Sequence, residues 1–147
     1  MSSLPFSALL RQPARAGIYR LPEAQRKKLP EACAKARFAC LPVDLRGIRK
    51  SDDALAALGR DLGFPDWYGA NFDALNDCLT DFSWQEAGGY VILIRGADAL
   101  ATGDPQGFAT LNAVFAAAVE AWREQDVALW IFYDCPAGAL GTLPVPT

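Results

Sequence analysis

Two nearly unbroken apolar runs, residues 90–94 and 127–133, limit what this chain can fold into. Runs of this kind are typical of strands covered on both faces, which occur mainly in parallel sheets. Between them, residues 108–124 carry apolar side chains at the spacing of an amphipathic helix. Residues 98–107 are polar and are expected to form a loop. A strand, a long helix and a second strand predict a right-handed crossover within a parallel sheet.

Two further elements are expected before these runs. Residues 38–45 alternate in part between apolar and other side chains, which predicts a strand. Pro42 within it favours an edge position or a bulge, because proline cannot donate a hydrogen bond to a neighbouring strand. Ser51 is expected to cap a helix that continues to Leu62 and ends at Gly63.

The leading residues give weaker signals. Residues 1–16 are expected to form a loosely held arm, followed by a short strand over residues 18–21. Residues 22–37 have helical composition, but Pro30 divides them. We therefore expect Pro30 in the first turn of a helix that ends near Ala36.

Together these elements predict an α/β fold with a small parallel sheet and packed helices. The 147 residues, 52% of them hydrophobic, suffice for a real core. Residues 38–135 are expected to form the main domain. Residues 1–37 are expected to form an extension that packs on the main domain or leads into it, and that adds a strand and a helix. Residues 136–147 are expected to form an extended tail. No stretch reads as a signal peptide or approaches the roughly 20 apolar residues that span a bilayer, so a cytoplasmic location is expected.

Residues 63–82, GFPDWYGANFDALNDCLTDF, hold the most informative pattern. Asn71 is a predicted N-cap for a short helix. At about 100° per residue the helix has an apolar and a polar side. The apolar side comprises Phe72, Leu75, Cys78, Leu79 and Phe82. The polar side comprises Asp73, Asn76, Asp77 and Thr80, with Asp81 at its flank.

Three of these polar residues, Asp73, Asp77 and Asp81, repeat every four residues with no Lys or Arg in the stretch. Like charges four apart on a helix cost about 0.2–0.5 kcal/mol per pair. The helix dipole favours Asp73 in the first turn, and the other two aspartates can be solvated. Spacing alone therefore leaves two interpretations, a solvated face and a binding face.

The segment F-P-D-W-Y-G-A-N-F-D-A-L-N-D-C-L-T-D-F resembles the signature of the barstar family, intracellular protein inhibitors of secreted bacterial ribonucleases. The resemblance extends from Phe38 to about Asp134 and is densest over residues 64–80. It implies a small parallel sheet with packed helices, and a turn and helix that plug the active site of a basic ribonuclease. It favours the binding interpretation of the acidic face.

The resemblance also implies residue roles. Asp77 is the expected deepest contact, with Asp73 one turn earlier on a second cationic group. Trp67 stands where the family usually has an aromatic residue that packs against the enzyme. Gly69 keeps the turn tight and Asn71 caps the helix. The expected partner-binding residues are Trp67, Gly69, Asn71, Asp73, Asn76, Asp77, Thr80 and Asp81.

Several positions depart from the family pattern. Asn76 occupies a position often held by tryptophan, Asp81 replaces a small residue, and Phe82 replaces another aromatic residue. These changes bear on which target is bound more than on how it is bound. The family also uses an acidic contact from its last helix, for which Glu120 and Glu124 are both candidates.

Composition narrows the functional classes. The chain has no histidine, which excludes histidine-based acid–base or nucleophilic catalysis and histidine-ligated metals. Its net charge of −3 argues against direct nucleic-acid binding and fits a basic protein partner. No cofactor or metal is expected. The four cysteines lack C-x-x-C spacing, so reduced thiols are expected over disulfides or a zinc site: Cys33, Cys40, Cys78 and Cys135.

Three functional hypotheses remain. The first is an immunity-type (antitoxin) inhibitor of a ribonuclease, and the second is a binding module of the same fold for a different basic protein. The third is an enzyme that uses Asp73 and Asp77 as a carboxylate pair or as Mg²⁺ ligands. Nothing nearby supplies a nucleophile or a phosphate-binding loop for this third hypothesis, so an inhibitor rather than an enzyme is expected.

Overall fold

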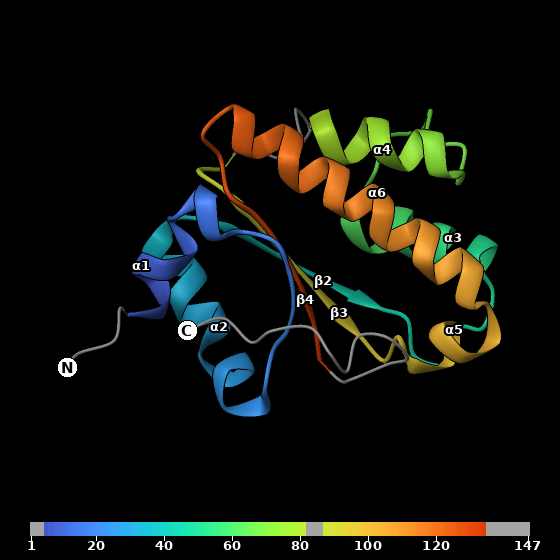
Figure 1. Ribbon diagram of the computed structural model, residues 1–147, viewed down its shortest axis with the longest axis horizontal. Helices are drawn as coiled ribbons and strands as arrows, with labels where there is room; N and C mark the ends of the chain where they lie inside the picture. The colour runs from blue at the N-terminus through green and yellow to red at the C-terminus, as the bar shows by residue number, and fades with distance from the viewer. Residues whose placement is uncertain (1–4, 82–86, 135–147) are drawn as a thin grey trace.

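Four parallel strands form one sheet within residues 5–81 and 87–134, the parts of the chain that the computed structural model describes (Figure 1). In sheet order they are β1 (Ile18–Arg20), β4 (Leu129–Tyr133), β3 (Tyr90–Arg95) and β2 (Ala39–Asp44). The two apolar runs are therefore the two central strands, and every residue of β4 is buried. The predicted edge position of Pro42 is confirmed, because β2 ends the sheet.

Helices cover both faces of this sheet (Figure 1). The short α1 and the longer α2 lie on one face, and α3 and α6 lie on the other. α4 forms an outer layer that packs on α6. The helices are α1 (Phe6–Leu10), α2 (Glu23–Ala36), α3 (Ser51–Leu62), α4 (Phe72–Asp81), α5 (Asp98–Gly103) and α6 (Pro105–Glu124), with a 3₁₀ turn at Pro13–Arg15. No helix in the described ranges is long and apolar enough to cross a membrane.

The expectation of a loosely held arm over residues 1–16 is wrong for the described part of that segment. α1 buries Leu9 and Leu10, and the indole Nε1 of the fully buried Trp130 donates to the Leu10 carbonyl oxygen at 2.9 Å. The Arg123 guanidinium of α6 donates to the carbonyl oxygen of Pro13 at 3.0 Å. The arm is fixed because its apolar residues cover the core, which local sequence does not reveal.

The rest of the leading segment adds the expected strand and helix, with one correction. β1 pairs in parallel with β4, with Ile18 opposite Ile131. α2 is continuous through Pro30, so the placement of that proline in a first turn is wrong. A proline inside a helix costs about 3 kcal/mol or more. Burial of one side of α2 offsets this cost, through Leu29, Ala32, Cys33 and Ala36.

The expected loop over residues 98–107 is also wrong, because it contains α5 and the first turn of α6. Asp104 is the N-cap of α6, and its side chain accepts a hydrogen bond from the backbone N–H of Gly107 at 2.9 Å. The same carboxylate accepts from the backbone N–H of Ser51 at 3.0 Å. Ser51 is thus the first residue of α3 rather than its cap, and one side chain at the junction of α5 and α6 caps two helices.

This double cap gives the first prediction. Backbone N–H donors from Gly107 and Ser51 lower the pKa of Asp104, so its stabilising contribution is present at neutral pH and is lost as pH falls through that lowered pKa. We expect Asp104→Ala to lower the melting temperature by about 3–8 °C at pH 7. The difference from the wild type should shrink in acid, below the usual aspartate range. Circular dichroism melts at several pH values test this. Equal melting at pH 7 would contradict the double cap.

Some expectations fall outside these observations. The extended tail at residues 136–147, Phe82 on the apolar side of α4, and Cys135 lie outside the described residues. The division into an extension, a main domain and a tail stays a prediction. The described part of the extension nevertheless shares one sheet with the rest, since β1 pairs directly with β4.

Candidate functional site

The turn before α4 is anchored to α3. The Tyr68 N–H donates to the Pro65 carbonyl at 3.0 Å, and its hydroxyl donates to the Leu55 carbonyl at 2.8 Å. The Tyr68 ring also meets the Phe64 ring edge-on, with centroids 4.8 Å apart. Burial raises the pKa of Tyr68 to about 12, so the hydroxyl remains a donor at neutral pH. The ring fits because α3 has a glycine, Gly59, directly beneath it.

Gly59 gives the second prediction. A Cβ there would lie 2.5 Å from the Tyr68 ring. Alanine is about 1 kcal/mol better than glycine inside a helix, yet we expect Gly59→Ala to destabilise the fold by about 1–3 kcal/mol through overpacking. In a Tyr68→Ala background the same change should stabilise. Urea unfolding of the four proteins of this double-mutant cycle tests the contact, and a stabilising effect in both backgrounds would refute it.

The turn presents Trp67 to solvent and leads directly into α4. Trp67 is 56% exposed and is the one large hydrophobic side chain exposed within the described ranges. A side chain on Gly69 would lie 3.1 Å from the Asn71 amide, so glycine lets the turn approach the helix closely. Asn71 Oδ1 accepts the Ala74 N–H at 2.8 Å, which confirms the predicted N-cap.

α4 has the two sides that its spacing predicts. Leu75, Cys78 and Leu79 are fully buried. The helix is tied to α6 by the Trp122 indole, whose Nε1 donates to the Leu79 carbonyl at 2.6 Å. The half-buried Thr80 uses its hydroxyl within the helix, on the Asn76 carbonyl at 2.8 Å. The other polar residues are exposed: Asp73, Asn76, Asp77 and Asp81.

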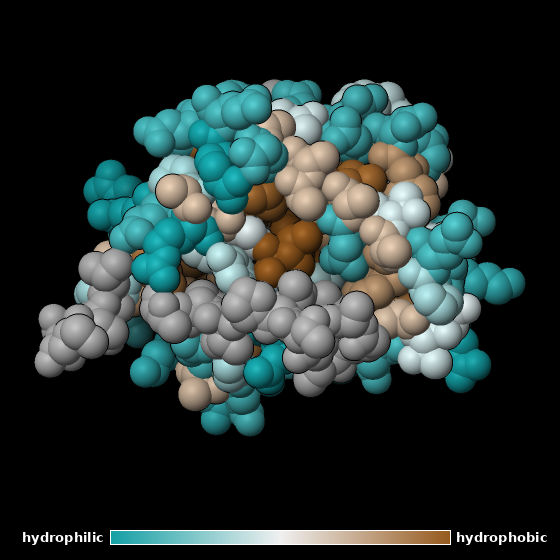
Figure 2. Space-filling view, in the orientation of Figure 1, coloured by the Kyte–Doolittle hydropathy of each residue, from teal (hydrophilic) through white to brown (hydrophobic). Residues whose placement is uncertain are grey.

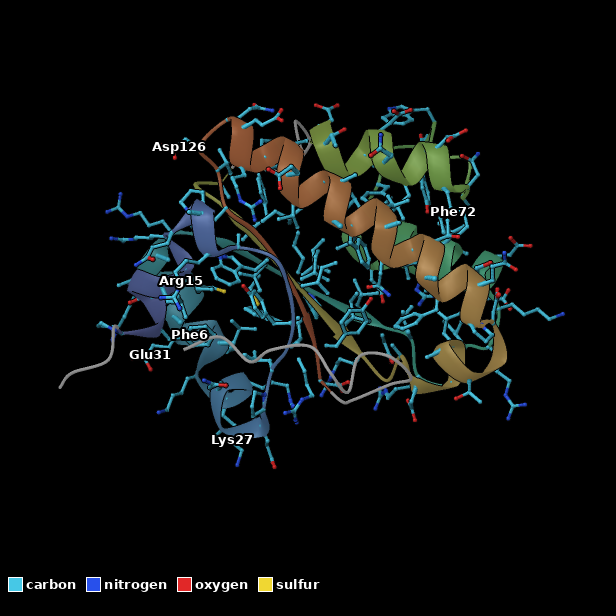
Figure 3. All side chains as sticks on the ribbon, in the orientation of Figure 1. Phe6, Arg15, Lys27, Glu31, Phe72 and Asp126 are labelled. Atoms are coloured by element: carbon cyan, nitrogen blue, oxygen red, sulfur yellow. The ribbon has the colours of Figure 1, made fainter. Side chains whose placement is uncertain are left out.

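The Lys and Arg side chains of the described residues form no ion pair with the two central aspartates of α4, Asp73 and Asp77. Eight of the fourteen Lys and Arg residues lie in residues 1–37, which supply α1, β1 and α2. Figure 3 shows Arg15 and Lys27 on that side of the sheet, away from Phe72 in α4. Asp73 and Asp77 thus face solvent as negative charges that no ion pair of the described residues neutralises.

The two acidic candidates of α6 differ. Glu120 forms an ion pair with Arg123, the residue that also holds the leading segment through Pro13. Glu124 is exposed, and no ion pair of the described residues includes it. Figure 2 shows hydrophilic residues gathered along the upper edge of the molecule, over α4 and the end of α6. Of the two, Glu124 is the one whose charge no ion pair of the described residues includes, and the choice between them stays a prediction.

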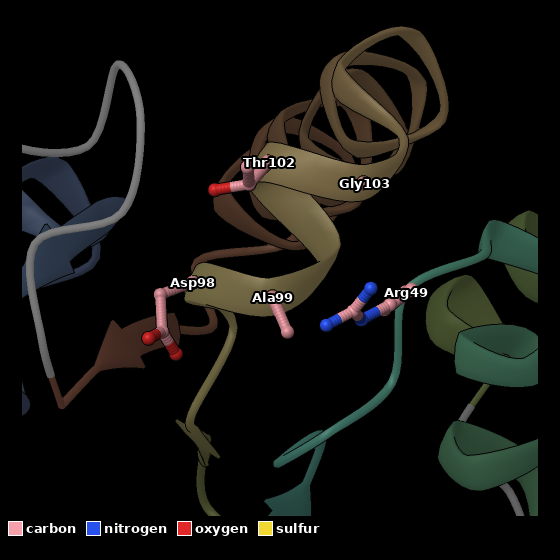
Figure 4. A pocket seen from close by; sticks show the side chains of 5 residues that line it. All are labelled: Arg49, Asp98, Ala99, Thr102 and Gly103. Atoms are coloured by element: carbon pink, nitrogen blue, oxygen red, sulfur yellow. The ribbon is translucent and has the colours of Figure 1, made fainter.

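Some surface hollows lined by described residues lie away from α4. One of about 300 Å³ lies between α5 and the connection from β2 to α3, lined by Arg49, Asp98 and Thr102 (Figure 4). Among the described residues, no three His, Cys, Asp or Glu side chains are grouped so that they could hold a metal. The acidic residues of α4 lie on an exposed helix face.

Fold and surface together define a class: a small α/β protein whose outermost helix presents carboxylates to solvent beside an exposed tryptophan. The chain belongs to the family described as Barstar (barnase inhibitor), whose model matches residues 38–134. Members of this family are ribonuclease inhibitors and not enzymes. No curated protein matches the chain. The matched residues run from β2 to β4 and include the turn and α4, whereas α1, β1 and the whole of α2 precede them.

Proposed function

We propose that this protein inhibits a basic ribonuclease by covering its active site with the acidic face. The acidic face is defined as the exposed side of α4 with the turn before it: Trp67, Gly69, Asn71, Asp73, Asn76, Asp77, Thr80 and Asp81. The observation that carries the proposal is the exposure of Asp73 and Asp77 without any ion pair within the described residues. Membership of the barnase-inhibitor family supports the same partner class.

The chemistry of a ribonuclease explains why carboxylates suit this role. Its active cleft binds the phosphates of RNA and therefore concentrates cationic groups. Asp73 and Asp77 are one helical turn, about 6 Å, apart, so they present two negative charges in a row. The helix is held by its N-cap and by Trp122, so binding costs little conformational entropy.

The individual residues have distinct roles in this proposal. Asp77 lies near the middle of the acidic face and enters the cleft deepest, and Asp73 contacts a second cationic group. Trp67 packs on the enzyme surface, where an exposed aromatic side chain gains most from burial. Asn76 and Asp81 border the contact and adjust which ribonuclease is bound. Binding requires neither a cofactor nor direct contact of this chain with RNA.

The test is a titration of a small basic ribonuclease of the barnase type with the full chain. We expect activity on an RNA substrate to fall linearly and to reach zero at one inhibitor per enzyme. The inhibition should weaken at high salt, because charge attraction speeds association. Full activity in the presence of excess inhibitor, with ribonucleases of several sequences, would contradict the proposal.

A second candidate is a basic partner without nuclease activity. The observation that favours it is the exposed Asn76 at a position often held by tryptophan in the family, next to the proposed deepest contact. This candidate predicts a complex that depends on Asp77 but leaves every tested ribonuclease active. Recovery of the bound protein from the native cell, followed by a nuclease assay of that protein, separates the two.

A further inference from the structure

Trp122 joins the last turn of α6 to the last turn of α4. Its indole Nε1 donates to the Leu79 carbonyl at 2.6 Å, across the interface of the two helices. α4 ends at Asp81, so this carbonyl belongs to the last turn, where helix carbonyls have no partner within the helix. The Trp122 indole therefore supplies a hydrogen bond that the backbone of α4 does not make itself.

The α6 side of this bond is fixed by its own contacts. The Trp122 side chain is buried, and its ring centroid lies 5.5 Å from that of Tyr90, the first residue of the central strand β3. The next residue of α6, Arg123, donates to the Pro13 carbonyl at 3.0 Å and to the Ala16 carbonyl at 2.6 Å. The end of α6 is thus held both by the sheet and by the leading segment, and it gives α4 a rigid support.

α4 depends on this support because it forms an outer layer that packs mainly on α6 (Figure 1). The Tyr68 hydroxyl ties the turn before α4 to α3, and the Trp122 bond ties the opposite end of the helix. Asp77 and Asp81 lie two residues before and two residues after Leu79. The bonded carbonyl therefore belongs to the part of α4 that carries these carboxylates.

We propose that Trp122 is a positioning residue for the acidic face. Its bond to Leu79 fixes the angle at which α4 presents Asp77, and the buried Trp122 side chain acts through α4 without contacting the partner. Charge-assisted hydrogen bonds depend on geometry, and a helix that must be ordered on binding loses affinity. The inference rests on the proposed function, because it states how the acidic face is held for a ribonuclease.

Trp130 provides a matched control. It is fully buried, and its indole Nε1 also donates to a backbone carbonyl, that of Leu10 at 2.9 Å. This bond lies on the face of the sheet that α1 covers, away from α4 (Figure 1). Trp122→Phe and Trp130→Phe thus each remove one indole–carbonyl hydrogen bond from the interior, but only Trp122→Phe should loosen α4.

The test compares both variants with the wild-type full chain. In Trp122→Phe the amides in the last turns of α4 should exchange with solvent about 2- to 10-fold faster relative to the amides of β4, the factor that one net hydrogen bond is worth. The Kd for a barnase-type basic ribonuclease should rise by about the same factor, mostly through faster dissociation. Trp130→Phe should change neither quantity, although it lowers the melting temperature as well.

A second replacement keeps the shape of the ring. Benzothienylalanine at position 122 has sulfur in place of the indole N–H, so it removes the donor without leaving a cavity if Trp122→Phe does not fold. Unchanged exchange of α4 in the Trp122 variants would overturn the positioning role, whether or not a ribonuclease is bound. Faster exchange with an unchanged Kd would also overturn the proposal. A wild-type chain that binds no ribonuclease contradicts the proposed function, and the exchange of α4 then decides the role of Trp122 by itself.

Discussion

Asp77→Ala is expected to weaken binding to the target ribonuclease by about 2–5 kcal/mol, or about 30-fold to several thousand-fold in Kd. This range comes from buried interfacial charge pairs that include those of barstar and its ribonuclease, so it is taken over from the family. The physical reason is that the truncation leaves a cationic group of the enzyme buried without its partner. In the free inhibitor Asp77 has no ion pair among the described residues to lose, so folding should hardly change.

Calorimetry or surface plasmon resonance measures this effect. Most of the loss should appear in the dissociation rate, because one charge changes long-range attraction only modestly. Asp73→Ala should weaken binding less. A matched control is Glu31→Ala, which removes an exposed carboxylate from α2 on the other side of the sheet. If Asp77→Ala binds as tightly as the wild type, Asp77 is not the deepest contact.

Removal of residues 1–37 is expected to abolish cooperative folding, the largest stability effect that the structure indicates. The described part of this segment buries four leucines, at about 1.5–3 kcal/mol each. Their sum is comparable with the 5–15 kcal/mol by which a whole domain is stable. β4 would also lose β1, one of its two neighbours in the sheet. The lost hydrogen bonds include those from Leu21 N–H to the Tyr133 carbonyl at 2.8 Å and from Ile131 N–H to the Gly17 carbonyl at 2.9 Å.

Urea denaturation and amide NMR spectra of the chain 38–147 measure this effect. Leu10→Ala in the full chain offers a graded version, with an expected cost of about 2–5 kcal/mol because Leu10 is fully buried. Lys27→Ala, which removes an exposed side chain of α2, should cost almost nothing. A shortened chain that unfolds at the same urea concentration as the full chain would show that residues 1–37 are dispensable.

The strands and most helices could be predicted from sequence because their signals are local. The apolar runs of β3 and β4, the helical spacing of α6 and the cap at Asn71 each depend on neighbouring residues. The predictions that are wrong concern segments whose structure is set by packing against residues far away in the sequence. Pro30 is tolerated because one side of α2 is buried, and the leading arm is ordered because it covers Trp130.

The candidate site likewise has one part that local sequence predicts and another part that depends on packing between distant residues. The helical period predicts which residues of α4 face solvent. It does not reveal what holds the turn, since Tyr68 meets Leu55 and Gly59 of α3 only in the folded chain. One signal was present: a glycine inside an otherwise helical pattern, as at Gly59, often marks a close approach of another group.

The most direct test of the central claim is competition for the ribonuclease between this protein and a nucleotide that binds the enzyme's active site. If the acidic face occupies the cleft in place of RNA phosphates, the nucleotide should raise the apparent Kd of the inhibitor in proportion to its concentration. The Asp77→Ala variant, with fewer contacts in the cleft, should be displaced at lower nucleotide concentration. A ternary complex, in which the nucleotide binds without changing the affinity of the inhibitor, would contradict the account.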